Sequence, residues 1–221
     1  MIFLCRRRPE LTRERYAELI LRGHVPLALK HHPTMHRYAV NVVEGEVEGG
    51  LDSIAALSFD SLADYLERLY DSPEGREIIG RDVEGFLGGA AAYATHEVVH
   101  RDDVPASPLG QRTPGVKWIC PLARRPGMSH EEFVAHWLGE HVPLALKHQP
   151  AITRFATNAV EQKLGDAGED WDGFAEIQFA GDTGPRERFT DSPEGAKALE
   201  ADHARFVGRS LVVPVAEYVQ K

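Results

Sequence analysis

Two histidines, His24 and His141, open identical octapeptides, His-Val-Pro-Leu-Ala-Leu-Lys-His, at residues 24–31 and 141–148. An imidazole titrates near neutral pH, so it can take up or release a proton under physiological conditions. This chemistry suits enolisation, decarboxylation or ring closure, and such acid–base steps typically contribute about 10²–10⁴-fold in rate. His24 and His141 are therefore candidate catalytic residues. The structural alternative is a buried histidine that bonds a backbone carbonyl.

The octapeptides belong to a longer repeat that divides the chain into two halves. Further pairs 117 residues apart are Arg8 and Arg125, Pro9 and Pro126, Arg37 and Arg154, Asn41 and Asn158, and Glu44 and Glu161. Asp-Ser-Pro-Glu-Gly at 71–75 recurs 120 residues later, at 191–195. Such self-similarity indicates an internal duplication. We predict one repeat at 1–100, a proline-containing linker at 101–115 and a second repeat at 116–221.

Each octapeptide is predicted to lie on a helix. Residues at spacings of three or four place His24 and His31 on one face with apolar neighbours, and the second copy repeats this pattern. The neighbours are Tyr16, Ile20 and Leu27 in the first copy, and Phe133, Trp137 and Leu144 in the second. Pro26 and Pro143 lack an N–H, so each helix should kink or restart beside its first histidine. His31 and His148 are predicted at helix C-termini, where they favour the dipole; a second substrate contact is the alternative.

The same order of elements is predicted in both halves from alternation, helical spacing and turn residues. The first half has strands at 2–5, 36–44, 53–59 and 91–99, and helices at 12–31, 61–70 and 72–89; the second has strands at 116–122, 151–160, 172–179 and 211–219, and helices at 129–148 and 192–206. A short helix is expected to be lost at 181–185. This α+β pattern, β-α-β-β-α-β, is that of a ferredoxin-like unit. Because each unit covers one sheet face with its own helices, we expect two repeats packed sheet to sheet as an intramolecular dimeric α+β barrel.

Several motifs of the second half resemble the EthD domain. They are Arg-Pro-Gly-Met-Ser-His-Glu-Glu-Phe at 125–133, Trp137, His141-Val-Pro, Arg154-Phe155, Trp171 to Glu176, and Asp-Ser-Pro-Glu-Gly at 191–195 followed by Asp202 and Phe206. The resemblance extends over both halves and implies the dimeric α+β barrel superfamily. That superfamily includes cofactor-free monooxygenases, isomerases and haem-handling proteins, and related members resemble decarboxylases and cyclases of aromatic polyketides. In the first half, Ile20 and Ala56 stand where the second has Trp137 and Glu176, so the resemblance favours the second half as the active one.

Other residues are predicted to contact a substrate beside the histidines. The aromatic candidates are Tyr16, Tyr38, Trp137 and Phe155. They could line an apolar pocket or form ordinary core. Asn41 and Asn158 fall in predicted strands, where asparagine is unfavourable, so we expect each to bond a ligand carbonyl or the facing histidine. Glu176 interrupts an apolar strand face and is predicted to be a buried carboxylate of the second half.

The spacing of the histidines argues against a metal site. His24 and His31 are separated by about 10 Å along a helix, whereas zinc ligands lie about 2 Å from the ion. The chain also lacks a glycine-rich dinucleotide motif, a phosphate loop and a serine elbow, so we expect no cofactor. Cys5 and Cys120 occupy non-equivalent positions and are predicted to be buried thiols.

Charge and hydropathy exclude two classes of partner. The formal net charge is −9, and no basic stripe extends beyond Arg6 to Arg8, which argues against nucleic-acid binding. No apolar stretch reaches the roughly 18–20 residues needed to cross a membrane, and the first ten residues lack the order of a signal peptide. We expect a cytoplasmic protein that binds a small hydrophobic or aromatic substrate. A homodimer of the two-repeat chain stays open.

These features favour a cofactor-independent enzyme of the lyase, isomerase or cyclase type, acting on an aromatic or β-keto substrate. His141 would be the general acid/base, and His24 its equivalent or a vestige. Two alternatives remain open. One is a non-catalytic small hydrophobic ligand-binding or stress protein, and the other is a haem-binding protein with His24 or His141 as axial ligand.

Overall fold

The computed structural model describes residues 1–181 and 190–221 of the chain. In the first half the elements are β1 (Ile2–Arg7), α1 (Arg13–Glu18), the π-helical turn η1 (Leu19–His24), α2 (Val25–His31), β2 (Arg37–Val43), β3 (Ser53–Ser58), α3 (Leu62–Arg68), α4 (Pro73–Glu84) and β4 (Leu87–Asp102). In the second half they are β5 (Val116–Arg124), α5 (His130–His136), the π-helical turn η2 (Trp137–His141), α6 (Val142–His148), β6 (Ile152–Leu164), β7 (Gly173–Phe179), α7 (Pro193–Phe206), β8 (Val207–Ser210) and β9 (Val213–Val219). No helix in residues 1–181 and 190–221 is long and apolar enough to span a membrane.

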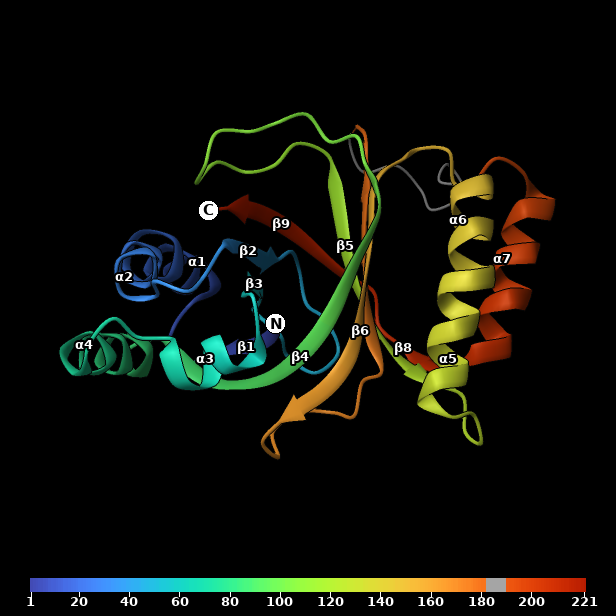
Figure 1. Cartoon of the computed structure of the whole chain (residues 1–221). Coiled ribbons are helices and arrows are strands. Elements are labelled where there is room, and N and C mark those ends of the chain that lie inside the picture. Colours follow the sequence, from blue (N-terminus) through green and yellow to red (C-terminus); the bar gives the residue numbers. More distant parts are fainter. Residues whose placement is uncertain (182–189) are drawn as a thin grey trace.

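The strands form a large antiparallel sheet that closes on itself. Their order is β7-β6-β4-β1-β3-β2-β9-β5-β8, and β7 also pairs with β5 (Figure 1). The two halves are hydrogen-bonded at two seams, β2 with β9 and β4 with β6. The predicted α+β class is confirmed. Instead of two sheets that only face each other, the halves share one continuous sheet, because their edge strands satisfy each other's backbone groups.

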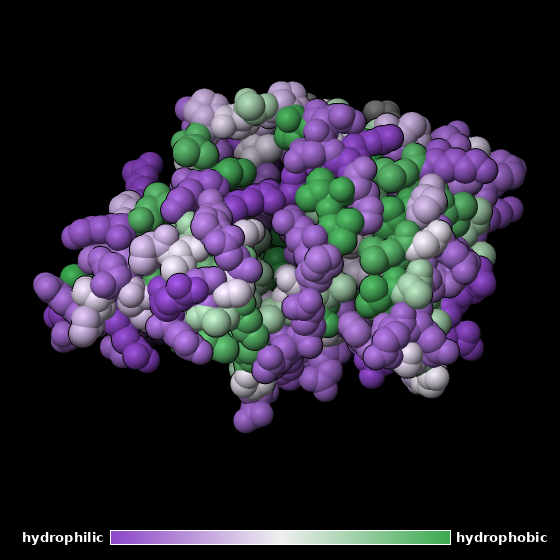
Figure 2. Space-filling model, viewed as in Figure 1, coloured by the Kyte–Doolittle hydropathy of each residue, from purple (hydrophilic) through white to green (hydrophobic). Residues whose placement is uncertain are grey.

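The helices lie outside the closed sheet, with α2 and α4 on one side and α6 and α7 on the opposite side (Figure 1). Apolar side chains fill three regions. One cluster inside the sheet includes Ile2, Ile54, Ile119 and Phe174. The other two lie between the sheet and the helices of each half. Figure 2 shows hydrophobic residues gathered between the sheet and α6 on the visible face.

A π-helical turn precedes each octapeptide helix, at the position where the prolines predicted a restart. The Val25 N–H bonds the carbonyl of Ile20, and the Val142 N–H bonds that of Trp137, five residues back in both cases. Pro26 and Pro143 then fall in the first turn of α2 and α6, where a missing N–H costs least. Short π-helical turns occur frequently at functional sites, and here each one ends at the first histidine of its octapeptide.

Three ionisable side chains are paired inside the closed sheet. Lys117 and Ile119 alternate with outward residues of β5, so both point inward. The Lys117 ammonium lies 2.7 Å from Glu176 and also bonds Glu217. All three side chains are at most 4% exposed. Burial alone would raise the pKa of Glu176, but the Lys117 charge and hydrogen bond lower it to about 2.

Several element boundaries differ from the sequence prediction. Gly88 and Gly89 lie within β4, not at a helix end, because α4 stops at Glu84 and the chain immediately pairs with β1. The predicted strand at 211–219 is β9, and β8 before it was not predicted. Strands β4 and β6 are longer than expected because they pair with each other. The helix loss predicted at 181–185 falls, beyond Gly181, outside the described residues.

We predict that Lys117→Met strongly destabilises the protein. The substitution leaves Glu176 and Glu217 buried without a cation, and breaking such a pair costs about 3–5 kcal/mol. Urea unfolding measures the change, and Lys197→Met, at an exposed position, should stay within about 0.5 kcal/mol of the parent. Because the pKa of Glu176 is lowered from 4.5 to about 2, its stabilisation is present above pH 4.5 and lost between these values. Equal stability of Lys117→Met and the parent at pH 7 would contradict this prediction.

Candidate functional site

The second half contains a cavity of about 500 Å³ between the sheet and the helices α6 and α7. His141 lines it together with the predicted contacts Trp137 and Phe155. Trp118 from β5 and His203 from α7 complete the aromatic part of the wall. We call this space the C-terminal cavity. The structure thus brings together three of the residues selected from the sequence.

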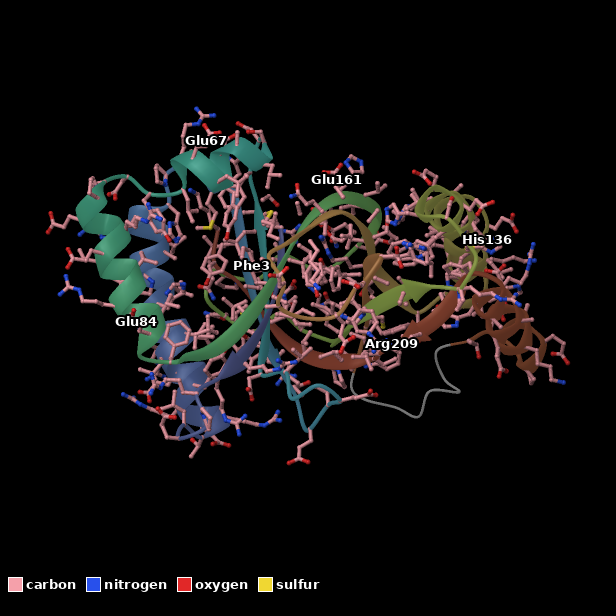
Figure 3. All side chains as sticks on the ribbon, turned by 90° about the horizontal axis from the view of Figure 1, so that it is seen from below. Phe3, Glu67, Glu84, His136, Glu161 and Arg209 are labelled. Atoms are coloured by element: carbon pink, nitrogen blue, oxygen red, sulfur yellow. The ribbon has the colours of Figure 1, made fainter. Side chains whose placement is uncertain are left out.

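The first half contains a smaller cavity, of about 270 Å³, on the opposite side of the sheet. His24 and the predicted contact Tyr38 line it, with Cys5 and His32. Helix α3 contributes Tyr65 to its wall. We call it the N-terminal cavity. Figure 3 separates the two regions: Phe3 lies at the N-terminal cavity, and His136 lies among the helices of the other half.

Each cavity histidine bonds an aspartate that the sequence analysis did not select for catalysis. His24 Nδ1 lies 2.8 Å from Asp82 Oδ2, and His141 Nδ1 lies 2.8 Å from Asp202 Oδ2. A carboxylate only accepts, so Nδ1 carries the proton and Nε2 is the basic nitrogen. The partner is therefore a carboxylate instead of the backbone carbonyl considered from sequence. The available signal was the recurrence of Asp82 as Asp202, 120 residues later.

Burial keeps both histidines uncharged at neutral pH. Loss of hydration lowers the pKa of His24 and of His141 below 6.5, and their aspartates partly oppose this effect. A neutral imidazole with a protonated Nδ1 and a free Nε2 is the form needed for a general base. In the second half, His203 and His136 lower the pKa of His141 further through charge repulsion.

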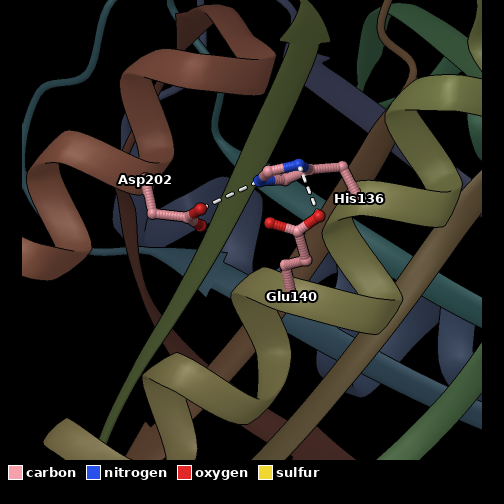
Figure 4. A group of neighbouring side chains, drawn as sticks. All are labelled: His136, Glu140 and Asp202. Carbon is pink, nitrogen blue, oxygen red and sulfur yellow. Dashed lines mark hydrogen bonds and ion pairs between the residues drawn. The ribbon is translucent and has the colours of Figure 1, made fainter.

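Asp202 is shared by two histidines. His136 donates from Nε2 to Asp202 Oδ1 over 2.9 Å (Figure 4). His141 donates to Asp202 Oδ2. Although burial alone would raise the pKa of Asp202, these two hydrogen bonds lower it. Leu19 occupies the position equivalent to His136 in the first half, so Asp82 lacks this second partner. The two histidine–aspartate pairs are thus electrostatically different.

The group His136, Glu140 and Asp202 also has metal-ligand chemistry, with candidate ligand atoms within 4.8 Å of one another. However, Nε2 of His136 faces Asp202, whereas its Nδ1 faces Glu140 at 3.6 Å (Figure 4). One ion binds a single ring nitrogen, so Glu140 would have to move to the other edge of the ring. The Arg205 guanidinium, 3.1 Å from Glu140, already balances the negative charge. This geometry describes a hydrogen-bond network better than a metal centre.

The trailing histidines of the octapeptides are not among the described residues that line the two cavities. His31 Nδ1 lies 3.0 Å from both carboxylate oxygens of Asp71, and His148 Nδ1 lies 3.1 Å from both oxygens of Asp191. Each contact joins the end of an octapeptide helix to the start of the facing helix. Their role as substrate contacts therefore remains only a prediction.

The polar strand residues also lie apart from the histidines. Asn41 donates to the Ile54 carbonyl, and Asn158 donates to Glu176, both over 3.0 Å. These bonds replace the expected contact with the facing histidine, because the three polar side chains point to the inner face of the sheet. Tyr16 is packed beneath α1, with its hydroxyl 2.9 Å from Ser53 Oγ.

Both cysteines are buried, as predicted. Burial raises the pKa of Cys5 to about 12, so its thiolate is not formed at neutral pH. Cys5 lines the N-terminal cavity and Cys120 the C-terminal one. They contribute apolar wall to these cavities.

Most residues that line the C-terminal cavity lie in a segment that matches a known sequence family. Residues 125–210 match the EthD domain. This match contains His136, His141 and Asp202, and it bears out the resemblance noted for the second half. The search of curated proteins gave no match.

Solved structures share the fold over almost the whole chain. An anthrone oxidase-like protein aligns with a TM-score of 0.63 and 12% identity, covering 99% of this chain and 91% of that one. A putative monooxygenase from Fusobacterium nucleatum gives 0.62 and 6%, covering 100% and 92%. A putative monooxygenase from Lactobacillus acidophilus gives 0.55 and 10%, covering 100% and 94%. At these identities the likeness establishes the fold and not the reaction.

We predict that Gly75→Ala disrupts the contact between His31 and Asp71. A Cβ at Gly75 would lie 2.2 Å from Asp71 Oδ1 and 2.7 Å from His31 Nδ1, so the pair must separate. Loss of this partly buried bond should lower the free energy of unfolding by about 1–3 kcal/mol. Gly80→Ala is the matched control in the same helix, because its Cβ meets nothing within 4 Å. The control should be neutral or stabilising by up to about 1 kcal/mol, and equal effects of both substitutions would refute the proposed contact.

Proposed function

We propose that the chain is a cofactor-independent lyase, isomerase or cyclase that acts on an aromatic or β-keto substrate in the C-terminal cavity. The observation that carries this proposal is the His141–Asp202 pair at the wall of a largely apolar cavity. We also propose that the two halves are ferredoxin-like, EthD-type repeats, the first of them diverged. The matching positions of the two histidine–aspartate pairs support this reading.

The chemistry follows from the protonation state of the pair. Nε2 of neutral His141 removes a proton from a carbon next to a substrate carbonyl, and the electron pair moves to the carbonyl oxygen as an enolate. Asp202 stabilises the imidazolium that results. Returning the same proton to another carbon gives isomerisation, whereas attack of the enolate carbon on a second carbonyl followed by loss of water gives cyclisation. Neither sequence requires an oxidant or a reductant.

The surrounding wall supports this chemistry. Trp137 and Phe155 are at most 1% exposed and offer rigid faces against which an aromatic ring can pack. Glu200 and His203 add polar groups at the α7 side of the cavity. A mostly apolar wall with a few polar groups is typical of small-molecule sites.

We predict that His141→Ala reduces kcat by about 10²–10⁴-fold, the range for loss of a general base. The measurement is product formation from a panel of aromatic and β-keto compounds, followed by mass spectrometry, with the fold checked by circular dichroism. His24→Ala is the matched control and should retain turnover if the C-terminal cavity is the active one. Undiminished turnover in His141→Ala would remove His141 from the mechanism.

The same panel separates the other functions. Stoichiometric binding without product would favour a ligand-binding protein. A Soret band after addition of haem would favour a haem protein. Substrate-dependent oxygen uptake would instead favour the monooxygenase chemistry named for two of the structural neighbours. Deprotonation of a carbon acid by His141 is also a first step of that chemistry. Oxygen uptake would therefore change the proposed reaction class, and His141 would still be the proposed base.

We predict that His136→Leu moves the acidic limb of the pH–kcat/KM profile to higher pH. A general base is active when neutral, so activity falls as pH drops through the pKa of His141, which burial places below 6.5. His136 lowers that pKa and competes for Asp202, so its removal raises the pKa. The remaining groups around the pair are His203, Glu140 and Arg205. Leu19 shows that leucine fits the equivalent position, and a limb that moves to lower pH would contradict this role.

A further inference from the structure

The N-terminal cavity differs from the C-terminal cavity at positions that decide which ligand it can hold. The equivalent pairs, N-terminal residue first, are Tyr38 and Phe155, His32 and Gln149, Ile20 and Trp137, Val83 and His203, and Gly80 and Glu200. The first half therefore lacks the carboxylate of Glu200 and the imidazole of His203. It has gained a tyrosine hydroxyl and another imidazole. The two spaces have the same framework and different polar groups.

Tyr38 provides an unused hydrogen-bonding group in the wall of the N-terminal cavity. Its side chain is 3% exposed and its ring is part of the apolar cluster beneath α2. Within the described part of the chain, its hydroxyl has no hydrogen-bond partner. Burial raises the pKa of Tyr38, so the hydroxyl stays protonated. The hydroxyl oxygen is not among the fully buried atoms that lack a partner, so it keeps some access and can donate a hydrogen bond to a ligand oxygen in the cavity.

Two imidazoles complement this hydroxyl. Nδ1 of His24 donates to Asp82, and Nδ1 of His32 donates to the Leu69 carbonyl over 3.2 Å. Burial lowers the pKa of both histidines, so both rings are neutral and each Nε2 is an acceptor. The wall of the cavity therefore includes the Tyr38 hydroxyl and two imidazoles, besides the hydroxyls of Tyr65 and Tyr70. A ligand hydroxyl fits this set, because it can accept from Tyr38 and donate to an imidazole.

The remaining wall selects against charge and for a ring. Its described residues include no aspartate, glutamate, lysine or arginine, so an ionised ligand would lose its hydration without gaining a counter-charge. Phe3 and Phe86 contribute aromatic faces, and Phe3 packs against Tyr65 with centroids 5.7 Å apart. A volume of about 270 Å³ is near the lower limit of ligand pockets and suits one or two fused rings.

We infer that the N-terminal cavity is a separate binding site for a small, neutral, hydroxylated aromatic compound, held by Tyr38 together with His24 or His32. This site is distinct from the C-terminal cavity and does not depend on the reaction proposed there. The chain would thus hold two unlike ligands on opposite sides of one sheet. A phenolic compound is the chemical class that the wall fits.

The test is a binding titration of the whole chain with 2-naphthol, compared with naphthalene and 2-naphthoate. Calorimetry gives affinity and stoichiometry. Tryptophan fluorescence reports the location, because Trp118 and Trp137 line the C-terminal cavity whereas the described lining of the N-terminal one contains no tryptophan. We expect 2-naphthol to bind more tightly than naphthalene and far more tightly than 2-naphthoate. Tyr38→Phe should weaken 2-naphthol about tenfold, the loss of one hydrogen bond, and leave naphthalene unchanged.

Two further variants locate the site. Ala90→Trp places a large ring in the N-terminal cavity and should abolish 2-naphthol binding, with the fold checked by circular dichroism. His141→Gln alters only the C-terminal cavity and should leave the 2-naphthol affinity unchanged, whatever its effect on turnover. The inference is overturned if 2-naphthol fails to bind, if Tyr38→Phe and Ala90→Trp bind it as the parent does, or if only His141→Gln weakens it.

Discussion

The fold depends on backbone hydrogen bonds at two seams, where β2 pairs with β9 and β4 pairs with β6. Without them each half would expose the unpaired N–H and C=O groups of two edge strands. Their pairing closes the sheet, and the buried charges on its inner face are paired with one another, as Lys117 is with Glu176 and Glu217. The cavities that carry the histidines are consequently left on the outer face, between sheet and helices. Barrel closure thus separates an interior ion cluster from two exterior sites.

Within each half, two histidine–aspartate contacts hold the octapeptide helix against the facing helix. His24 bonds Asp82 near one end of α2, and His31 bonds Asp71 near the other. The π-helical turn and the proline set the first histidine at the cavity wall, while the glycine of Asp-Ser-Pro-Glu-Gly permits the close approach of the second. The first histidine can therefore serve both packing and chemistry. Its Nδ1 joins the helices, and its Nε2 remains available to a ligand.

Local patterns in the sequence predicted most of the elements and the helix restarts at Pro26 and Pro143, since these depend on neighbouring residues. They did not predict the aspartate partners, because Asp202 is 61 residues from His141 and a carboxylate on a helix is usually solvated. The prediction that Phe155 and Asn158 contact the same substrate failed for a different reason. Residues three apart on a strand point to opposite faces, so these two could not line the same cavity. The alternation of side chains along a strand places Asn158 and Glu176 on the inner face of the closed sheet, opposite Phe155.

The two halves also show why a shared framework leaves the chemistry open. The histidine, the aspartate and the helix geometry are kept, and both imidazoles have the same orientation and a lowered pKa. What differs is the second partner of the aspartate, Leu19 against His136, and the cavity wall, Tyr38 against Phe155. The first difference changes the electrostatics of the histidine–aspartate pair, and the second changes the polar groups of the cavity wall. Because neither alters the backbone, the halves can keep one fold while their sites diverge, and a structural likeness at 6–12% identity carries no information about either site.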